Sequence, residues 1–240
     1  GGPKTMLAAA SRSRAAVAAR SLLQRRAMVT TASMDVEQDG EDAPRQPPKK
    51  QRIPLPTLSN PLFTPDPAHK ARIDEMVRVD HAGEAGAIRI YDGQLAVLRG
   101  TDVEELIMSM RDGEQEHLDT MERLVQERRT RPTALLPLWD VAGFVLGAGT
   151  ALLGKEAAMA CTAAVEEVIT EHYNDQIREL RGMGYDEEEL KRVIIKHRDD
   201  EEEHRDTGFA HGAEQAPFYG ALSAVIKAGC RAAIMVSQKI

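Results

Sequence analysis

EQEH at residues 114–117 and EEEH at residues 201–204 are two copies of one pattern, a Glu followed three positions later by a His. Each copy follows a Glu in an apolar stretch, Glu84 in VRVDHAGEAGA and Glu166 in CTAAVEEV. The chain therefore runs Glu, Glu-x-x-His, Glu, Glu-x-x-His, as if one helical hairpin were used twice. Four-helix bundles that bind two iron or manganese ions carry this ligand set. The pattern predicts an all-α fold with a four-helix bundle at its centre.

The spacing of apolar residues predicts where the four helices lie and which acidic residues face inward. They recur at steps of three and four, the period of one helix face, over about residues 67–98, 103–124, 155–181 and 186–211. Glu84, Glu166 and both Glu-x-x-His pairs fall on these faces. Glu167 is rotated by about 100° from Glu166 and is expected to be solvated.

The shared buried position makes six residues candidate metal ligands. One Glu on an apolar face is more often a misphased surface residue than a ligand, and one Glu-x-x-His pair is a similarly weak signal. Four unpaired carboxylates in one core are not tenable, whereas two metal ions would neutralise them. Oxygen and imidazole donors without thiolate favour iron or manganese over structural zinc. The candidate ligands are Glu84, Glu114, His117, Glu166, Glu201 and His204.

Other polar residues near these positions could orient the ligands through hydrogen bonds. They are Asp80, His81, His172, Tyr173 and His197. A structural role is the simpler interpretation for each. His197 lies on the buried face one turn before Glu201 and is either a spectator or a gate residue.

Composition excludes some classes of protein. The 240 residues are 42% hydrophobic and 4% aromatic, with a formal net charge of −7. An acidic chain argues against a nucleic-acid binder. Two cysteines, Cys161 and Cys230, are too few for a disulfide framework and are expected to be reduced and buried.

The N-terminal part of the chain is expected to lie outside the folded domain. Residues 1–33 contain six basic side chains and no acid, which is typical of a mitochondrial transit peptide. A disordered basic tail is the alternative. Residues 34–67 hold eight of the 12 prolines and are predicted to form an extended linker. Residues 68–240 are then the folded domain.

Residues 135–153 form a first additional apolar segment, with one charged residue in nineteen. Its length approaches that of a membrane span, but a proline and several glycines favour a surface-lying or re-entrant element that faces a membrane. Burial in a dimer interface is the alternative. The spacing of Gly143 and Gly147 would allow close contact with another helix.

Residues 217–240 predict a final amphipathic helix. Lys227 and Arg231 stand one turn apart on one side of it, away from its apolar side. A basic amphipathic helix is typical of a membrane surface. A fifth bundle helix that covers the core is the alternative.

Four longer stretches carry a resemblance to a known family. They are VRVDHAGEAGAIRIYDGQ (77–94), RPTALLPLWDVAGFVLGAGTALLGKEAAMACTAAVEE (131–167), HYNDQIREL (172–180) and AEQAPFYGALSAVIKAGCRAAI (213–234). They resemble the mitochondrial 5-demethoxyubiquinone hydroxylases, which are ferritin-like di-iron monooxygenases of ubiquinone biosynthesis. The resemblance covers residues 71–240. The sequence departs from the family pattern in its long N-terminal extension and at His197 and Glu171.

The resemblance implies a ferritin-like bundle that holds two iron ions. The family's iron ligands match the six residues that the helix period selects. The four Glu would supply terminal and bridging oxygens, and His117 and His204 would each bind one iron. The family's histidine after the ligand on the third helix matches His172, with Tyr173 beside it, and both are expected to support the centre.

The reaction implied by the resemblance is hydroxylation of the C6 ring position of a demethoxyquinone with O2. Electrons would come from NADH, which would act transiently because the chain has no Gly-x-Gly-x-x-Gly fingerprint. The two additional helices would rest on the matrix face of the mitochondrial inner membrane and admit the isoprenoid tail of the quinone between them. A lipid-binding accessory protein of the same pathway is an expected partner, and the chain is compatible with a homo-oligomer.

Two other functions would use the same six ligands. One is a ferritin-like iron-storage or iron-buffering protein, and the other is a manganese peroxidase or catalase of the same fold. Neither would need the two additional apolar helices. A requirement for detergent favours the quinone enzyme, and a large soluble assembly favours storage.

Overall fold

The computed structural model describes residues 66–183 and 187–240. The predicted transit peptide, residues 1–33, lies outside the described residues, as does the predicted linker, residues 34–67, except for its last two positions. The described part consists of helices and loops without a strand, which confirms the predicted all-α class.

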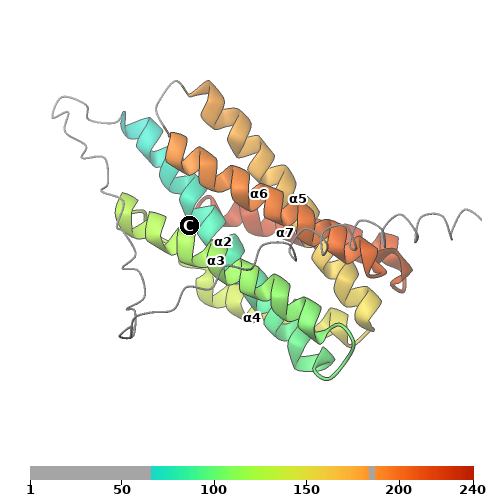
Figure 1. Cartoon of the computed structure of the whole chain (residues 1–240). Helices are drawn as coiled ribbons and strands as arrows, with labels where there is room; N and C mark the ends of the chain where they lie inside the picture. Colours follow the sequence, from blue (N-terminus) through green and yellow to red (C-terminus); the bar gives the residue numbers. More distant parts are fainter. Residues whose placement is uncertain (1–65, 184–186) are drawn as a thin grey trace, which may run out of the picture. The chain divides into compact units, whose positions relative to one another are not determined.

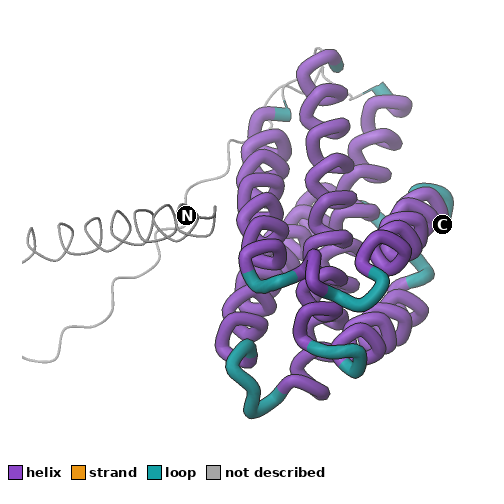
Figure 2. The backbone as a smooth tube through the Cα atoms, turned by 90° about the vertical axis from the view of Figure 1, so that its right-hand side faces the viewer, coloured by secondary structure: helices purple, strands orange, loops and turns teal. Residues whose placement is uncertain are grey.

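The helices lie side by side and are joined by loops at the ends of a bundle (Figure 1 and Figure 2). Four of them, α2, α3, α5 and α6, correspond to the four predicted from the apolar period. α4 connects the two hairpins, and α7 follows α6 through the short 3-10 helix η1. The elements are α2 Pro67–Leu98, α3 Glu104–Arg128, α4 Leu136–Ala151, α5 Lys155–Gly182, α6 Glu188–Ala210, η1 Ala213–Gln215 and α7 Tyr219–Ser237.

The bundle encloses a polar layer between two apolar clusters. One cluster includes Tyr91 of α2 and Ile107 of α3. The other includes Ile73 of α2 and Met121 of α3. The first cluster thus lies near the C-terminal end of α2 and near the N-terminal end of α3, because the two helices run in opposite directions. The candidate ligands occupy the middle of each helix, so that apolar packing excludes water from both ends of their layer.

α4 packs closely against α2 through glycines. Gly147 lies against the backbone of Ile90, and a Cβ at position 147 would overlap the Ile90 carbonyl oxygen. A Cβ at Gly143 would lie 2.8 Å from the carbonyl oxygen of Gly86. The predicted close contact through Gly143 and Gly147 is confirmed, and its partner is α2.

α7 packs on α5 with its basic side toward the bundle. Nζ of Lys227 lies 2.6 Å from Glu167 Oε2, and Nη2 of Arg231 lies 2.8 Å from Glu171 Oε2. Both cations therefore pair with carboxylates of α5, although Arg231 stays half-exposed. The prediction that Lys227 and Arg231 form a basic side for a membrane surface stays a prediction. Glu167, expected to be solvated, is partly exposed and paired with Lys227.

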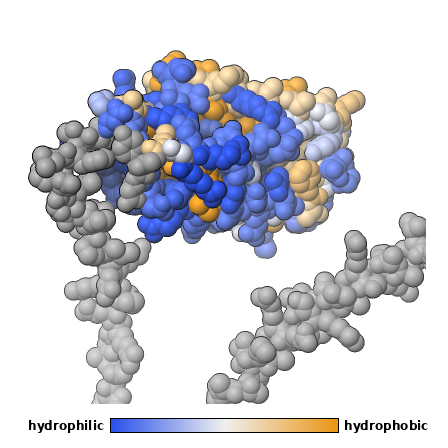
Figure 3. Space-filling model, turned by 90° about the horizontal axis from the view of Figure 1, so that it is seen from above, coloured by the Kyte–Doolittle hydropathy of each residue, from blue (hydrophilic) through white to orange (hydrophobic). Residues whose placement is uncertain are grey.

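Apolar side chains of α4 and α7 point away from the bundle. Val141 and Val145 of α4 are largely exposed, as are Val225 and Met235 of α7. Seen from above, hydrophilic residues cover most of the face, and hydrophobic residues gather along one edge (Figure 3). By length and composition α7 could cross a membrane, whereas α4 is a shorter apolar helix. Both additional helices therefore join the bundle and expose an apolar side.

Candidate metal centre

The six candidate ligands meet in one buried site. The four glutamates are each at most 3% exposed, although they come from four different helices. Two overlapping groups formed by these six residues offer ligand atoms within 4.8 Å of one another. They are Glu84, Glu114, His117 and Glu201, and Glu114, Glu166, Glu201 and His204. A third group brings His197 together with Glu84 and His117. The two four-residue groups could each hold a metal ion, and they share the carboxylates of Glu114 and Glu201.

Both histidines present Nδ1 to the carboxylates. Nδ1 of His117 lies 3.3 Å from Glu201 Oε1, and Nδ1 of His204 lies 2.9 Å from Glu114 Oε1. On the other side of its ring, Nε2 of His117 lies 2.9 Å from Asp200 Oδ2. An Nε2–H bond to this carboxylate leaves the lone pair on Nδ1, which is the tautomer that binds a metal ion.

Burial and mutual repulsion change the proton affinity of the site. Burial, together with the charge of Glu201, raises the pKa of Glu114 to about 7. Burial and the same neighbour also raise the pKa of Glu166 well above its ordinary value. Burial alone would lower the pKa of His204, but the close approach of its Nδ1 to the carboxylates of Glu114 and Glu201 outweighs burial and raises that pKa to about 11. Metal binding at this site therefore has to displace protons.

Buried atoms without hydrogen bonds indicate that the donor set fits cations. Among the described residues, neither oxygen of Glu114 has a hydrogen-bond partner, and neither does Nδ1 of His117. His204 approaches Glu114 closely but without the geometry of a hydrogen bond. Buried carboxylates are costly unless they are paired or bind a metal. Two divalent ions would balance the four carboxylates, and these donors suit iron or manganese.

Tyr173 and His172 take different positions beside the site. Tyr173 Oη donates a hydrogen bond of 2.5 Å to Glu84 Oε1. Nε2 of His172 lies 3.2 Å from Asp80 Oδ1 and 2.9 Å from Gln176 Nε2. Tyr173 therefore touches a candidate ligand directly, whereas His172 belongs to a separate polar group.

The other two histidines proposed from the sequence also differ. Nδ1 of His81 is buried without a hydrogen-bond partner in the described part of the chain. His197 instead lies within the site, with Nδ1 3.2 Å from Glu84 Oε1.

Two supporting residues were not singled out from the sequence. Tyr91 Oη donates a hydrogen bond of 3.1 Å to Glu166 Oε1. Tyr91 lies on the buried face of the helix period, and that signal could have found it. Asp200, the partner of His117, lies in an acidic run that has the pattern of a solvated surface. No sequence signal separates it from its acidic neighbours.

An apolar cavity of about 410 Å³ reaches the site from the side of α4 and α7. Glu84 and Glu166 line its inner end, and the walls include Leu146 of α4 and Ile226 of α7. Val225, which also lines it, is exposed on the surface. A second cavity, of about 280 Å³, is lined mostly by polar residues of α3 and α6 and reaches both candidate histidine ligands.

A family model described as "Ubiquinone biosynthesis protein COQ7" matches residues 71–237. This chain belongs to the COQ7 family. The match spans all four helices of the bundle as well as α4 and α7, and it includes the six candidate ligands. The resemblance noted in the sequence is thereby confirmed, together with the ferritin-like helical class.

Relatives of this COQ7 chain are named as hydroxylases. The Homo sapiens protein named NADPH-dependent 3-demethoxyubiquinone 3-hydroxylase, mitochondrial, is 54% identical over 179 residues, which are 74% of this chain and 82% of the relative. The Rhodospirillum rubrum 3-demethoxyubiquinol 3-hydroxylase is 55% identical over 177 residues, or 73% and 82% of the two chains. The Saccharomyces cerevisiae 5-demethoxyubiquinone hydroxylase, mitochondrial, is 41% identical over 187 residues, or 72% and 80%.

Proposed function

We propose that this chain hydroxylates the ring of a demethoxyubiquinone in ubiquinone biosynthesis, using O2 and a di-iron centre. The observation that carries the proposal is a buried Glu and His site at the inner end of an apolar cavity, in a chain of the COQ7 family. The names of the relatives favour this hydroxylase over an iron-storage protein. The cavity supports the same choice, because a quinone with an isoprenoid tail needs an apolar path and stored iron does not.

The six candidate residues are the proposed iron ligands. Glu114 and Glu201 would contribute to holding both ions, since both belong to each of the two four-residue groups. When bound, the iron would supply the activation of O2. The ligands proposed for one ion besides these two are Glu84 and His117, and those for the other are Glu166 and His204.

The side chains around the cavity would position the quinone and hold protons beside it. The apolar walls exclude water and fit the ring and the start of the tail. Asp80 and His172 also line the cavity and can form hydrogen bonds with the ring oxygens. Glu166, whose pKa is raised by burial, and Tyr91, which donates to it, hold protons at the inner end.

Hydroxylation consumes one oxygen atom of O2 at the ring carbon and reduces the other to water, so that two electrons are needed. The resemblance implied NADH as their source, and the human relative is named NADPH-dependent. Either nucleotide delivers the same hydride. The described residues form helices only and contain no βαβ unit for a dinucleotide. We therefore propose that the reduced nicotinamide binds transiently.

We place the enzyme on the matrix face of the mitochondrial inner membrane, with residues 1–33 as the targeting segment, residues 34–67 as a linker and residues 68–240 as the hydroxylase domain. The human and yeast relatives are named mitochondrial. The exposed apolar residues of α4 and α7 flank the cavity, so a quinone could pass from lipid to the site without crossing water. Association with a lipid-binding accessory protein and with further copies of the chain stays a prediction.

The test is a single-turnover experiment. Iron-loaded protein is mixed without oxygen with a demethoxyquinone and either NADH or NADPH, then exposed to air, and the quinone is analysed by mass spectrometry. A gain of one oxygen atom is expected in the wild type and not in Glu166→Ala. Iron that is oxidised and retained while the quinone is unchanged would contradict the proposal and favour storage.

A further inference from the structure

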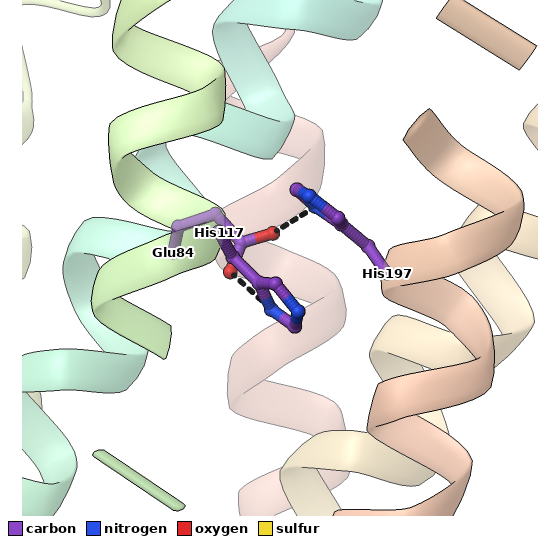
Figure 4. A group of neighbouring side chains, drawn as sticks. All are labelled: Glu84, His117 and His197. Carbon is purple, nitrogen blue, oxygen red and sulfur yellow. Dashed lines mark hydrogen bonds and ion pairs between the residues drawn. The ribbon is translucent and has the colours of Figure 1, made fainter. Parts of the chain in front are cut away.

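We propose that His197 is a positioning residue of the metal centre, and that it fixes Glu84 so that one oxygen of this carboxylate faces the metal. The proposal rests on the centre proposed above. His197 lies on α6 and is 2% exposed. Figure 4 shows His197, Glu84 and His117 pointing toward one another from three different helices. A ring nitrogen of His197 also lies within 4.8 Å of ligand atoms of Glu84 and His117, but the orientation of its ring distinguishes this role from that of a ligand.

One oxygen of Glu84 is occupied by hydrogen bonds. Oε1 accepts from Tyr173 Oη at 2.5 Å and lies 3.2 Å from Nδ1 of His197. Because an ionised carboxylate oxygen can only accept, Nδ1 of His197 carries the hydrogen. Oε2 faces Nδ1 of His117 at 3.6 Å, which is the direction of the ligand group. Glu84 is therefore held so that Oε2 is presented to the metal.

His197 is not placed to bind the same ion as His117. The two imidazole rings are stacked, with centroids 4.1 Å apart and planes at 21°. An imidazole binds a metal ion along a lone pair in its ring plane, at about 2.1 Å. Lone pairs in two stacked, nearly parallel rings do not converge on one ion at that distance. His197 therefore acts through the carboxylate of Glu84 and through the face of the His117 ring.

An N–H donor suits this position, because a hydrogen bond from His197 stabilises the buried carboxylate of Glu84. Tyr173 closes the site on another side, with its ring edge-on to His197 at a centroid distance of 6.3 Å. His197 and Tyr173 thus fix the same carboxylate oxygen from two helices.

Two substitutions separate the hydrogen bond from the stacking. His197→Gln keeps an N–H donor and loses the ring, whereas His197→Phe keeps a flat ring and loses the donor. The measurement is anaerobic titration of the full chain with Co²⁺, followed by the absorption of the bound ion. The affinity for one of two ions should fall about 10–100-fold in His197→Phe, as for other groups that orient ligands. His197→Gln should restore most of it. His211→Phe, an exposed change at the C-terminal cap of the same helix, should have no effect.

Thermal unfolding of the metal-free variants checks that they fold. Unchanged Co²⁺ affinity in His197→Phe would overturn the proposal, and so would an equal loss in His197→Gln. A double-mutant cycle provides a second test, because Tyr173→Phe removes the other donor to Oε1. The two losses should be non-additive, and additive losses would show that the two side chains do not act on one atom. A wild type that binds no pair of ions would instead overturn the metal centre itself.

Discussion

Glu166 and Glu167 are neighbours on α5 with opposite surroundings. Glu166 is buried in the ligand group, whereas Glu167 is partly exposed and pairs with Lys227. Glu166→Ala is therefore expected to lose one of the two iron ions, and Glu167→Ala to keep both and to lose about 0–1 kcal/mol of stability. The check is the iron content per chain after anaerobic reconstitution. Equal iron in the two variants would refute the assignment of Glu166.

Proton binding should make the stability of the metal-free protein depend on pH. The pKa of Glu114 is raised from 4.5 to about 7, and that of His204 from 6.5 to about 11. In each case the folded chain binds the proton more tightly than the unfolded chain. The stability from Glu114 is full below about 4.5 and is lost as the pH rises through about 7, and that from His204 is lost between about 6.5 and 11.

The protein, once a chelator has removed its metal ions, is therefore expected to unfold at a lower temperature at about pH 8.5 than at about pH 6. Calorimetry of the metal-free protein from about pH 4.5 to about pH 8.5 measures the effect. Glu114→Gln is the matched variant, and it should flatten the profile between about pH 4.5 and 7 because one titrating group is removed. A melting temperature that rises with pH in the metal-free wild type would contradict the prediction.

At the scale of elements, the helical period of the apolar residues predicted which face of each helix is buried, but not which helix packs against that face. It predicted the four bundle helices. It also distinguished Glu166 from Glu167, because a buried ligand has to lie on the apolar face of its helix and only Glu166 does. It could not show that Lys227 and Arg231 face α5, because a basic side suits a carboxylate partner as well as a lipid surface. The contact of Asp200 with His117 was hidden for the same reason, since only the arrangement of α3 and α6 brings the two together.

The contact of α2 with α4 depends on the absence of side chains at a few positions. A methyl group at Gly147 would overlap the backbone of Ile90, which cannot move without shifting α2. Gly147→Ala is expected to destabilise the protein by about 1–3 kcal/mol, the usual cost of overpacking. Gly149→Ala, on the same helix, meets no atom within 4 Å and should be neutral or stabilising by up to about 1 kcal/mol. Urea unfolding of both variants measures the difference, and equal stabilities would contradict the close packing.

For the whole molecule, two cavities of different polarity reach the site. The cavity on the side of α4 and α7 is apolar, and the cavity between α3 and α6 is lined mostly by polar residues. An apolar substrate and polar species would therefore reach the ligands from different sides. Apart from Met108, the large exposed apolar residues in the described part of the chain lie on or next to the two helices that wall the first cavity. These helices can therefore do more than cover the core.

This arrangement predicts membrane binding that depends on apolar contact rather than on charge. Val145 and Val225 are 62% and 71% exposed, and burying each in lipid contributes about 1.5–3 kcal/mol. Val145→Asp and Val225→Asp should each weaken flotation with phosphatidylcholine vesicles by about tenfold or more. Added salt should have little effect, because Lys227 and Arg231 are engaged with α5.

Met108→Asp is the matched control for these two variants, because Met108 is 46% exposed but lies on α3, away from the apolar helices. It should bind vesicles like the wild type, which would show that a new negative charge alone does not prevent binding. Vesicle binding that is unchanged in Val145→Asp and Val225→Asp, together with conversion of a dimer to a monomer in gel filtration, would assign the apolar side to a second copy of the chain. Binding abolished by salt would instead return the basic residues of α7 to the membrane, at the expense of their ion pairs with Glu167 and Glu171.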